Sequence, residues 1–514
     1  MIQKRVIADL LAYLPAKVLP ALTPFITVPI FTRLFSPDQY GLYMLAFGVS
    51  EFLLAATCTG FAAGAIRFYT AYRRESALPT FFATAFSSVG AVVAVTTAIG
   101  AAALIALQSV IAADLYPLLW AALFMFAANA WFTTLMHILR GQERARWYTA
   151  LELGYRYGMI GISLVLILVF GAGVSGLLWG QFLALLVALI PLWALTTRGT
   201  ALRAGTPRRA DYRRMWGYAI PLTIGNMAYW GLRLADRYVI DAFHGSYEVG
   251  LYSVSYNIAA RTIDLVVGLF LLVPGPIIMR LWEEEGRRAA EDALTTVTHF
   301  YVLLVLPAVV GLAALAVPLV DLLAENAYFR GHRAVWLVAV GSLAFGLGQL
   351  GGMGLLLAQR TGSIARNQFL ATGFSLALNL IAVPRLGFMG AAISVCVASV
   401  LLAALQAAAS ARFVTWRWPA KTLIRGLAAA GLMGGAVAAF VRVTGGYDTT
   451  IPALNQIVIL LLAVIIGVVV YGGMLWAFGE LSPRRVLSLF TREGRSSAAA
   501  GDGFVTPSSV RGSR

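Results

Sequence analysis

The chain has 514 residues, of which 60% are hydrophobic and 12% are charged. Soluble domains carry about 25% charged residues, so this composition excludes a soluble globular protein and indicates a helical protein that crosses a membrane many times. The net charge of +16 could suggest nucleic-acid binding. The basic residues, however, fall in short loops between apolar runs and form no basic domain, so we expect no nucleic-acid partner.

Fourteen apolar runs approach or exceed the roughly 20 residues that a membrane-spanning helix needs. They are 7–31, 42–66, 80–106, 115–139, 148–170, 175–197, 217–240, 250–278, 296–320, 334–358, 367–384, 389–411, 426–443 and 453–478. The run 367–384 is short and contains the polar residues Gln368 and Asn379. We therefore expect an all-α, polytopic membrane fold with about 14 transmembrane helices.

The first run is unusual because it carries four prolines and a lysine. Pro15, Pro20, Pro24 and Pro29 predict a helix built to bend, and Lys17 places a charge inside the span. Both features are tolerated mainly where a helix lines a cavity or packs inside protein. The polar stretch that follows, Ser36 to Gly41, predicts a turn in which the glycine permits a chain reversal.

The basic residues set the orientation, because Lys and Arg concentrate in cytoplasmic loops. Most of the 39 Lys and Arg residues fall on the side that the two termini share if the number of spans is even. We expect a multi-pass membrane protein with both termini in the cytoplasm. The segment Trp282–Thr296 is expected to form a short surface helix with Glu/Arg pairs.

Local patterns recur between the two halves of the chain. Gly-Leu-Tyr at 41–43 returns at 250–252, Gly-x-x-Gly at 173–176 returns at 387–390, and Ala-Arg at 145–146 returns at 365–366. An even-numbered repeat predicts two parallel six-helix lobes around a central cavity. The expected divisions are an amino-terminal lobe (1–197), a cytoplasmic basic linker (198–216), a carboxy-terminal lobe (217–411), two extra helices (412–478) and a disordered cytoplasmic tail (479–514).

Ionisable side chains inside spans are functional candidates, because they are costly in hydrocarbon. Glu152 and Arg156 are spaced i, i+4, which favours pairing on one helix face, although a cavity role is equally compatible. Arg233, with Asp236 and Arg237, could pair locally or snorkel to the outer interface.

The remaining candidates lie deeper in their spans. Arg261 and Asp264 are i, i+3 neighbours near mid-membrane, which favours a cavity position for both. Lys17 and Glu51 lie at comparable depth on adjacent spans, so they could form a pair. An acid of this kind that took up a proton could couple opening to protons.

The sequence resembles polysaccharide-biosynthesis flippases of the Wzx type, within the multidrug/oligosaccharidyl-lipid/polysaccharide exporter superfamily. The resemblance is carried by TRLFSPDQYGLY (32–43), DRYVIDAFHGSYEVGLYSVSYNIA (236–259), RGQERARWY (140–148) and LGFMGAA (386–392). It implies a two-lobed bundle that moves undecaprenyl-diphosphate-linked sugar units to the outer leaflet. It also implies cationic residues in the cavity on spans one and eight, where Lys17 and Arg261 fall.

On this interpretation Lys17, Arg156, Arg233 and Arg261 bind substrate, while Glu51, Glu152 and Asp264 pair charges or couple ions. The expected partners are the lipid-linked glycan, membrane lipids, a proton or sodium ion, and a polysaccharide polymerase complex; no catalytic residue, metal or cofactor is expected. One alternative is a MATE-like, ion-coupled exporter of small molecules, which would need an acid-dominated cavity. Another is a polytopic glycosyltransferase or polymerase, although the outer loops are too short for its usual catalytic motifs.

Overall fold

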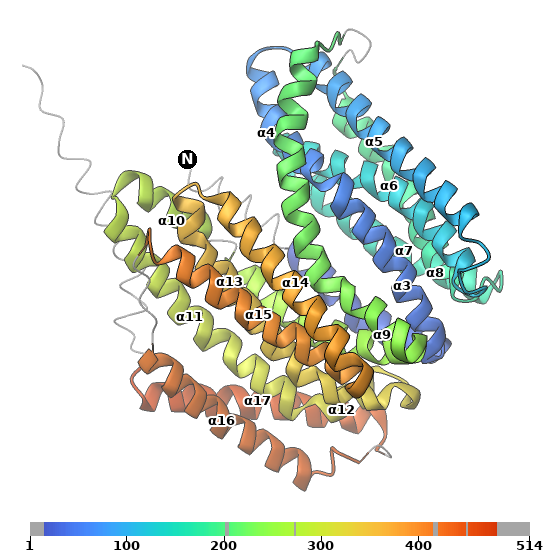
Figure 1. The fold of residues 1–514 in the computed structure, drawn as a ribbon. Coiled ribbons are helices and arrows are strands. Elements are labelled where there is room, and N and C mark those ends of the chain that lie inside the picture. The colour runs from blue at the N-terminus through green and yellow to red at the C-terminus, as the bar shows by residue number, and fades with distance from the viewer. Residues whose placement is uncertain (1–14, 201–204, 272–273, 415–419, 449–450, 481–514) are drawn as a thin grey trace, which may run out of the picture.

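The computed structural model describes residues 15–200, 205–271, 274–414, 420–448 and 451–480, and the regular elements in these ranges are helices. Their bounds are α2 (Pro15–Leu34), α3 (Pro37–Thr57), α4 (Thr59–Arg74), α5 (Leu78–Ala106), α6 (Tyr116–Gly141), α7 (Ala145–Leu168), α8 (Ser175–Thr197), α9 (Arg209–Leu271), α10 (Pro274–Glu284), α11 (Arg287–Ala314), α12 (Ala316–Leu323), η2 (Asn326–Gly331), α13 (His332–Leu357), α14 (Thr361–Leu386), α15 (Phe388–Ser410), α16 (Ala420–Val443) and α17 (Ala453–Ala477). Figure 1 shows them as one bundle of long helices.

Eleven of the described segments are long and apolar enough to cross a membrane. The other expected spans correspond to α2, whose apolar part in the described residues is the shorter stretch Leu22–Leu34, and to the two arms of α9. Helices suit this setting because all their backbone groups bond within the segment, where no water is available. The structure confirms the expected polytopic all-α fold.

The long helix α9 contains two expected spans. The chain reverses at Gly245, whose backbone (φ 78°, ψ 176°) interrupts the helical angles. A side chain would be strained at this conformation, so a glycine is needed at the turn. We call residues 209–244 the first arm and 246–271 the second arm.

Two local predictions are wrong. The turn after α2 is confined to Phe35 and Ser36. Ser36 caps α3 together with Gln39 in a capping box, and Gly41 lies inside the helix. The segment Trp282–Thr296 is not one surface helix, because Gly286 (φ 88°) separates the end of α10 from the start of α11. The Glu/Arg pairing expected there is present between Arg287 and Glu291 at 2.8 Å.

The internal repeat is visible in the backbone. Gly173 and Gly387, which the sequence pattern aligns, share a left-handed conformation with φ of 55° and 58°. Glu143 and Gln359, in the loops before α7 and α14, share φ values of 59° and 55°. These loops are therefore equivalent, but in a register that does not align the two Ala-Arg pairs.

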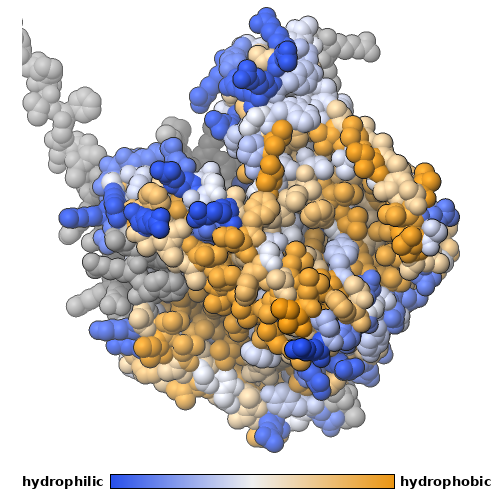
Figure 2. All heavy atoms as spheres, in the orientation of Figure 1, coloured by the Kyte–Doolittle hydropathy of each residue, from blue (hydrophilic) through white to orange (hydrophobic). Residues whose placement is uncertain are grey.

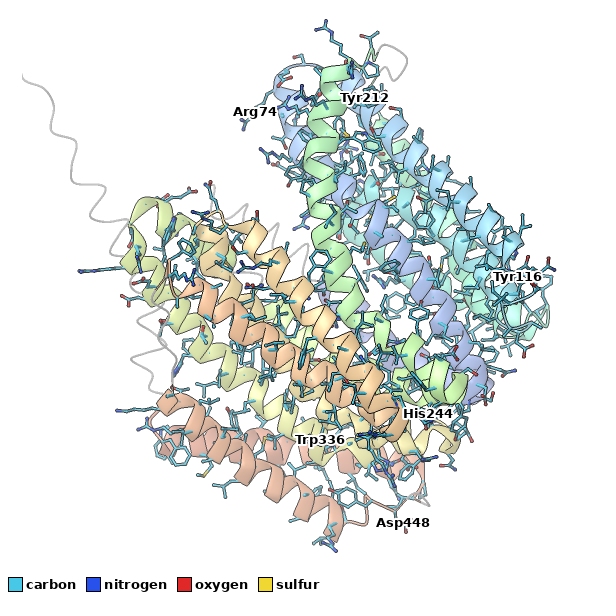
Figure 3. All side chains as sticks on the ribbon, in the orientation of Figure 1. Arg74, Tyr116, Tyr212, His244, Trp336 and Asp448 are labelled. Atoms are coloured by element: carbon cyan, nitrogen blue, oxygen red, sulfur yellow. The ribbon has the colours of Figure 1, made fainter. Side chains whose placement is uncertain are left out.

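The bundle opens at the end that carries Arg74 and Tyr212, while His244 and Asp448 lie at the opposite end (Figures 1 and 3). Figure 2 shows hydrophilic residues over α4 and over α10, on either side of a notch in the surface, with a hydrophobic band beyond them. We call the Arg74 end the open end and the His244 end the closed end.

At the closed end, the repeated glycines bring α3 and the second arm of α9 into backbone contact. A Cβ on Gly41 would overlap the Ser246 carbonyl, and one on Gly250 would overlap the Pro37 carbonyl. Asn257 donates a hydrogen bond to the Tyr40 hydroxyl at 3.3 Å between the same two helices. The two copies of the Gly-Leu-Tyr motif thus form one contact between the halves, which we call the seam.

Along the other side, the first arm of α9 packs on the amino-terminal helices. At the break between α3 and α4, the Gly60 N–H donates to the Thr223 hydroxyl at 3.1 Å, and Asn226 donates to the Thr59 hydroxyl at 3.2 Å. Farther toward the open end, Trp216 donates to Ser88 on α5 at 3.1 Å. The division into lobes at 198–216 stays a proposal, since these contacts cross it.

The last two helices form a separate layer. Helix α16 packs on α11 and α17, and the Tyr471 hydroxyl donates to the Leu303 carbonyl at 2.8 Å. They lie along the outside of the carboxy-terminal half (Figure 1). Of the tail expected at 479–514, residues 481–514 lie outside the described residues, whereas Glu480 is buried and pairs with Arg425 at 2.8 Å.

The seam predicts that Gly41 cannot carry a large side chain. We expect Gly41→Leu to lower the melting temperature of the purified protein in detergent, because overpacking a close contact costs about 1–3 kcal/mol or more. Gly154→Leu is the matched control, because a Cβ there meets no atom within 4 Å. Equal melting temperatures for the two variants would contradict the seam.

Candidate functional site

The candidate charges lie on helices from both halves of the chain. Glu51 is on α3, Glu152 and Arg156 are on α7, Arg233 is on the first arm of α9, and Arg261 and Asp264 are on the second arm. Lys17 lies on α2, but its side chain is outside the described part of the structure. Its predicted pairing with Glu51 therefore stays a prediction.

Each of the three guanidinium nitrogens of Arg233 donates a hydrogen bond. Its Nη2 donates to Asp264 Oδ2 at 2.7 Å, its Nη1 to the Tyr229 hydroxyl at 2.9 Å, and its Nε to the Tyr256 hydroxyl at 3.0 Å. The rings of Tyr229, Tyr256 and Phe345 also lie within 6 Å of the guanidinium carbon, close enough for cation–π attraction. Arg233 therefore ties the two arms of α9 together.

The partner of Asp264 is thus Arg233 on the facing arm rather than Arg261 on its own helix. The i, i+3 spacing brings Arg261 and Asp264 near each other, but the planar fork of Arg233 reaches the carboxylate directly. Arg261 is exposed and makes no ion pair within 4 Å among the described residues. Its charge is therefore free to meet a ligand.

On α7, the predicted i, i+4 pair is confirmed. Arg156 Nε donates to Glu152 Oε1 at 2.9 Å, with 40% of the arginine side chain and 14% of the glutamate side chain exposed. The pair leaves two other nitrogens of the guanidinium open. Arg156 can therefore keep its ion pair with Glu152 and still bind a ligand.

Glu51 is partly buried on α3 and accepts a hydrogen bond from Asn129 Nδ2 on α6 at 3.3 Å. Thr133 in turn donates to Asn129 Oδ1 at 3.3 Å, which fixes the orientation of the amide. Asn129 lies in the apolar run 115–139, and its contact with an acid on another helix could not be inferred from the sequence. The structure places it beside the candidate charges.

These groups interact across the boundary between the halves. Arg261 on α9 interacts electrostatically with Arg156 on α7, as well as with Arg233 and Asp264. Glu51 on α3 interacts with both Arg156 and Arg261. Three arginines and three acids, contributed by α3, α7 and both arms of α9, therefore form one cluster, which we call the arginine cluster.

Asp236 and Arg237 lie beside the arginine cluster, where Arg237 Nη1 donates to the Arg233 carbonyl at 2.8 Å, and they form the expected local ion pair at 3.4 Å. Both are buried, with Arg237 5% exposed, so the arginine does not snorkel to the interface. Asp236 accepts a hydrogen bond from the Tyr252 hydroxyl, and Arg237 Nε donates to Ser253 at 3.3 Å. These hydrogen bonds connect the first arm of α9 to the second arm, so Asp236 and Arg237 stabilise the packing of the two arms.

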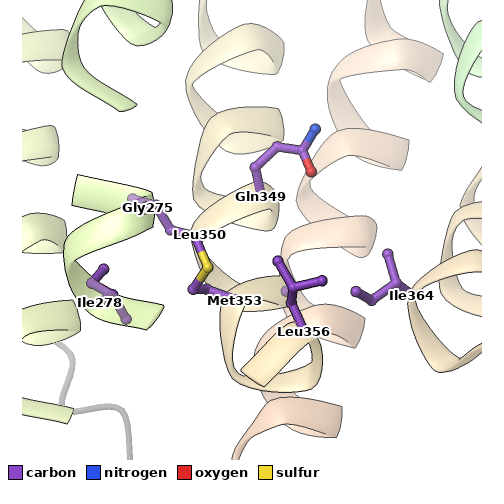
Figure 4. A pocket seen from close by; sticks show the side chains of 8 residues that line it. Gly275, Ile278, Gln349, Leu350, Met353, Leu356 and Ile364 are labelled. Carbon is purple, nitrogen blue, oxygen red and sulfur yellow. The ribbon is translucent and has the colours of Figure 1, made fainter. Parts of the chain in front are cut away.

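The arginine cluster is also distinct from an apolar pocket of about 220 Å³ at the open end of the carboxy-terminal half (Figure 4). The pocket lies between α10, α13 and α14 and is lined by Gly275, Ile278, Gln349, Leu350, Gly352, Met353, Leu356 and Ile364. Gln349 is the polar residue of this lining, and it lies one helical turn beyond Phe345. The pocket has no charge that could bind an anion.

The fold is that of a polytopic helical membrane protein with a repeat in its two halves. Residues 6–282 match the family described as polysaccharide biosynthesis protein. The chain belongs to this family, which confirms the expected resemblance to polysaccharide-biosynthesis proteins.

Solved structures support the same fold. The lipid II flippase MurJ in an inward closed conformation is similar with a TM-score of 0.69 and 12% identity, covering 92% of this chain and 98% of that chain. An inward-facing multidrug resistance MATE transporter is similar with a TM-score of 0.67 and 15% identity, covering 76% of this chain and 94% of that chain. Comparison with curated protein sequences gives no match.

The contact between Arg233 and Asp264 predicts strong coupling between these two residues. We expect Arg233→Met and Asp264→Leu each to lower the melting temperature, because each leaves a half-buried charge without its partner, at a cost of about 2 kcal/mol. The double variant should lose much less than the sum of the two.

The exposed pair Arg280 and Glu284, 4.0 Å apart, provides the control for this cycle. Its single and double variants should be additive, because exposed pairs contribute little. Additive losses for Arg233 and Asp264 as well would show that the two side chains do not stabilise each other.

Proposed function

We propose that this protein is a flippase that moves undecaprenyl-diphosphate-linked oligosaccharide, such as a repeat unit of O-antigen or exopolysaccharide, across the bacterial inner membrane. The observation that carries the proposal is that Arg156 and Arg261, from opposite halves, both present guanidinium groups that are not fully paired. Guanidinium groups bind phosphate oxygens in bidentate geometry. A diphosphate headgroup is the matching ligand.

The mechanism follows from the barrier that the headgroup faces. A diphosphate must leave water and cross a hydrocarbon core about 30 Å thick. In the proposed cycle, the headgroup enters from the open end, which the arginine-rich loops assign to the cytoplasm, and binds between the halves. The seam of Gly41 and Gly250 then separates while the open end closes, so that the headgroup is released at the other side.

Membership in the polysaccharide biosynthesis family supports the choice of a lipid-linked glycan. The similar fold of MurJ, a lipid II flippase, also supports this choice. An ion gradient or the consumption of the product by a polymerase complex would supply the driving force. The residues Glu51 and Asp264 are the acids that could carry a coupling proton.

Two experiments test the proposal. In cells, deletion of the gene should cause lipid-linked oligosaccharide to accumulate on the cytoplasmic leaflet. A membrane-impermeant glycosidase added outside spheroplasts should then fail to cleave it. In proteoliposomes, the purified protein should transfer a fluorescent undecaprenyl-diphosphate glycan between leaflets faster than empty liposomes do. Equal transfer with and without protein would refute the function.

A MATE-like exporter of small molecules is the second candidate, and the similar fold of MATE transporters favours it. Such a protein would lower the accumulation of cationic drugs in cells. We expect no such change when this chain is expressed, because its cluster contains as many arginines as acids. Reduced drug accumulation would favour the exporter instead.

The proposed site predicts that its arginines are needed for transport and not for folding. We expect Arg156→Ala and Arg261→Ala, and also Lys17→Ala, to reduce flipping at least tenfold while the amount of protein in the membrane stays unchanged. Arg385→Ala, at the exposed end of α14, is the control and should flip at the wild-type rate. If both Arg156→Ala and Arg261→Ala flip at the wild-type rate, the arginine cluster is not the substrate-binding site.

A further inference from the structure

A short segment at the closed end, made of α12 and η2, lies between α11 and α13 (Figure 1). It is fixed to the second arm of α9, in its own half of the chain. Ser255 Oγ donates to the Gly331 carbonyl at 2.6 Å, and a Cβ on Gly331 would lie 2.9 Å from the Leu251 carbonyl oxygen. The Tyr247 hydroxyl donates to the Ala327 carbonyl at 3.3 Å. The helix η2 is therefore part of the carboxy-terminal half.

Two side-chain hydrogen bonds join this segment to the end of α2. The Tyr328 hydroxyl in η2 donates to the Phe35 carbonyl at 2.8 Å, and Arg33 Nη2 donates to the Leu322 carbonyl in α12 at 3.2 Å. Tyr328 is fully buried, and its ring packs edge-on against Tyr40 of α3, with 6.1 Å between the ring centroids. The segment therefore contacts both α2 and α3.

Helix α2 belongs to the opposite half. Tyr157 on α7, the residue after Arg156, donates to the Leu19 carbonyl of α2 at 3.3 Å. The carbonyls in the last turn of a helix have no partner within that helix, and Tyr328 supplies a donor just beyond this turn, at Phe35. The two bonds therefore connect the halves at a place separate from the seam.

We propose that these two bonds, from Tyr328 and from Arg33, form a latch that holds the closed end shut and that must open in each transport cycle. This inference rests on the proposed function, in which the closed end separates to release the headgroup. The seam holds the same end by close backbone packing, which depends on glycines that no smaller residue can replace. The latch uses directional hydrogen bonds, which a single substitution removes without creating a clash.

The bond from Tyr328 favours the closed conformation because of the carbonyl that it serves. While this end is closed, the Phe35 carbonyl accepts from the hydroxyl of a fully buried side chain. When the end opens, the same carbonyl can bond to water. Loss of one neutral hydrogen bond of this kind should raise the ratio of open to closed molecules about two- to tenfold.

The test measures how often the closed end opens. Asn257→Cys places a thiol in the seam, in a background where Cys58→Ala and Cys396→Ala have removed the two cysteines of the chain. A membrane-impermeant maleimide added outside intact cells reaches this thiol when the closed end opens, since this end faces outward in the proposed orientation. We expect Tyr328→Phe to raise the labelling rate about two- to tenfold.

Two further variants make the measurement specific. Arg33 is exposed, so Arg33→Met removes the second bond without disturbing the core and should also raise the rate. The Tyr471 hydroxyl donates to the Leu303 carbonyl at 2.8 Å, but neither residue belongs to the amino-terminal half. Tyr471→Phe should therefore be labelled at the parent rate.

A faster rate in Tyr328→Phe or Arg33→Met, with the parent rate in Tyr471→Phe, supports the latch. Parent rates in both latch variants would overturn it. An equal rise in Tyr471→Phe would also overturn it, because the loss of any buried tyrosine hydroxyl would then loosen the protein.

The labelling needs no substrate, so its outcome is separate from that of the flipping assay. If the protein does not flip the glycan and the latch variants are labelled faster, the proposed function fails and the latch belongs to a transporter of another ligand. If the protein flips the glycan and the labelling rates are equal, only the latch fails.

Discussion

The structure depends on the cost of placing an ionised side chain inside a bilayer, which is about 2.5–3.5 kcal/mol or more at the centre of a spanning helix. Each charge in the middle of this protein must therefore find a partner or an aqueous surface. Arg233 meets this requirement with three hydrogen bonds and three aromatic rings. Arg156 and Arg261 meet it only in part, because both remain substantially exposed, and this difference separates a structural cation from cations available to a ligand.

The internal repeat forms the seam, the contact at which the two halves of the chain meet. The Gly-Leu-Tyr motif occurs once in each half, and its two glycines face each other's helix at the closed end, where any side chain would overlap backbone. A contact between backbones with few side chains can separate without unfolding either helix. The first arm of α9 provides the second connection, through Thr223 and Asn226 at the break between α3 and α4.

The two connections and the arginine cluster suit one task. In the proposed function, a headgroup bound between Arg156 and Arg261 would contact both halves at once, so its binding would favour a conformation in which the halves approach each other. Such a site must also let its ligand go, since a site that binds an anion too tightly cannot release it on the other side of the membrane.

The sequence by itself determined the membrane class, the spans, the pairing of Glu152 with Arg156, and the equivalence of Gly173 and Gly387, because these depend on local composition and on spacing along one helix. It could not determine that Asp264 binds Arg233, that Asn129 holds Glu51, or that Gly41 serves a close approach and not a turn. Those outcomes depend on which helix faces which, and helices distant in the chain become neighbours only through packing. Only the tertiary structure, therefore, distinguished Arg233, whose three guanidinium nitrogens all have partners, from Arg261, which makes no ion pair within the described part of the chain.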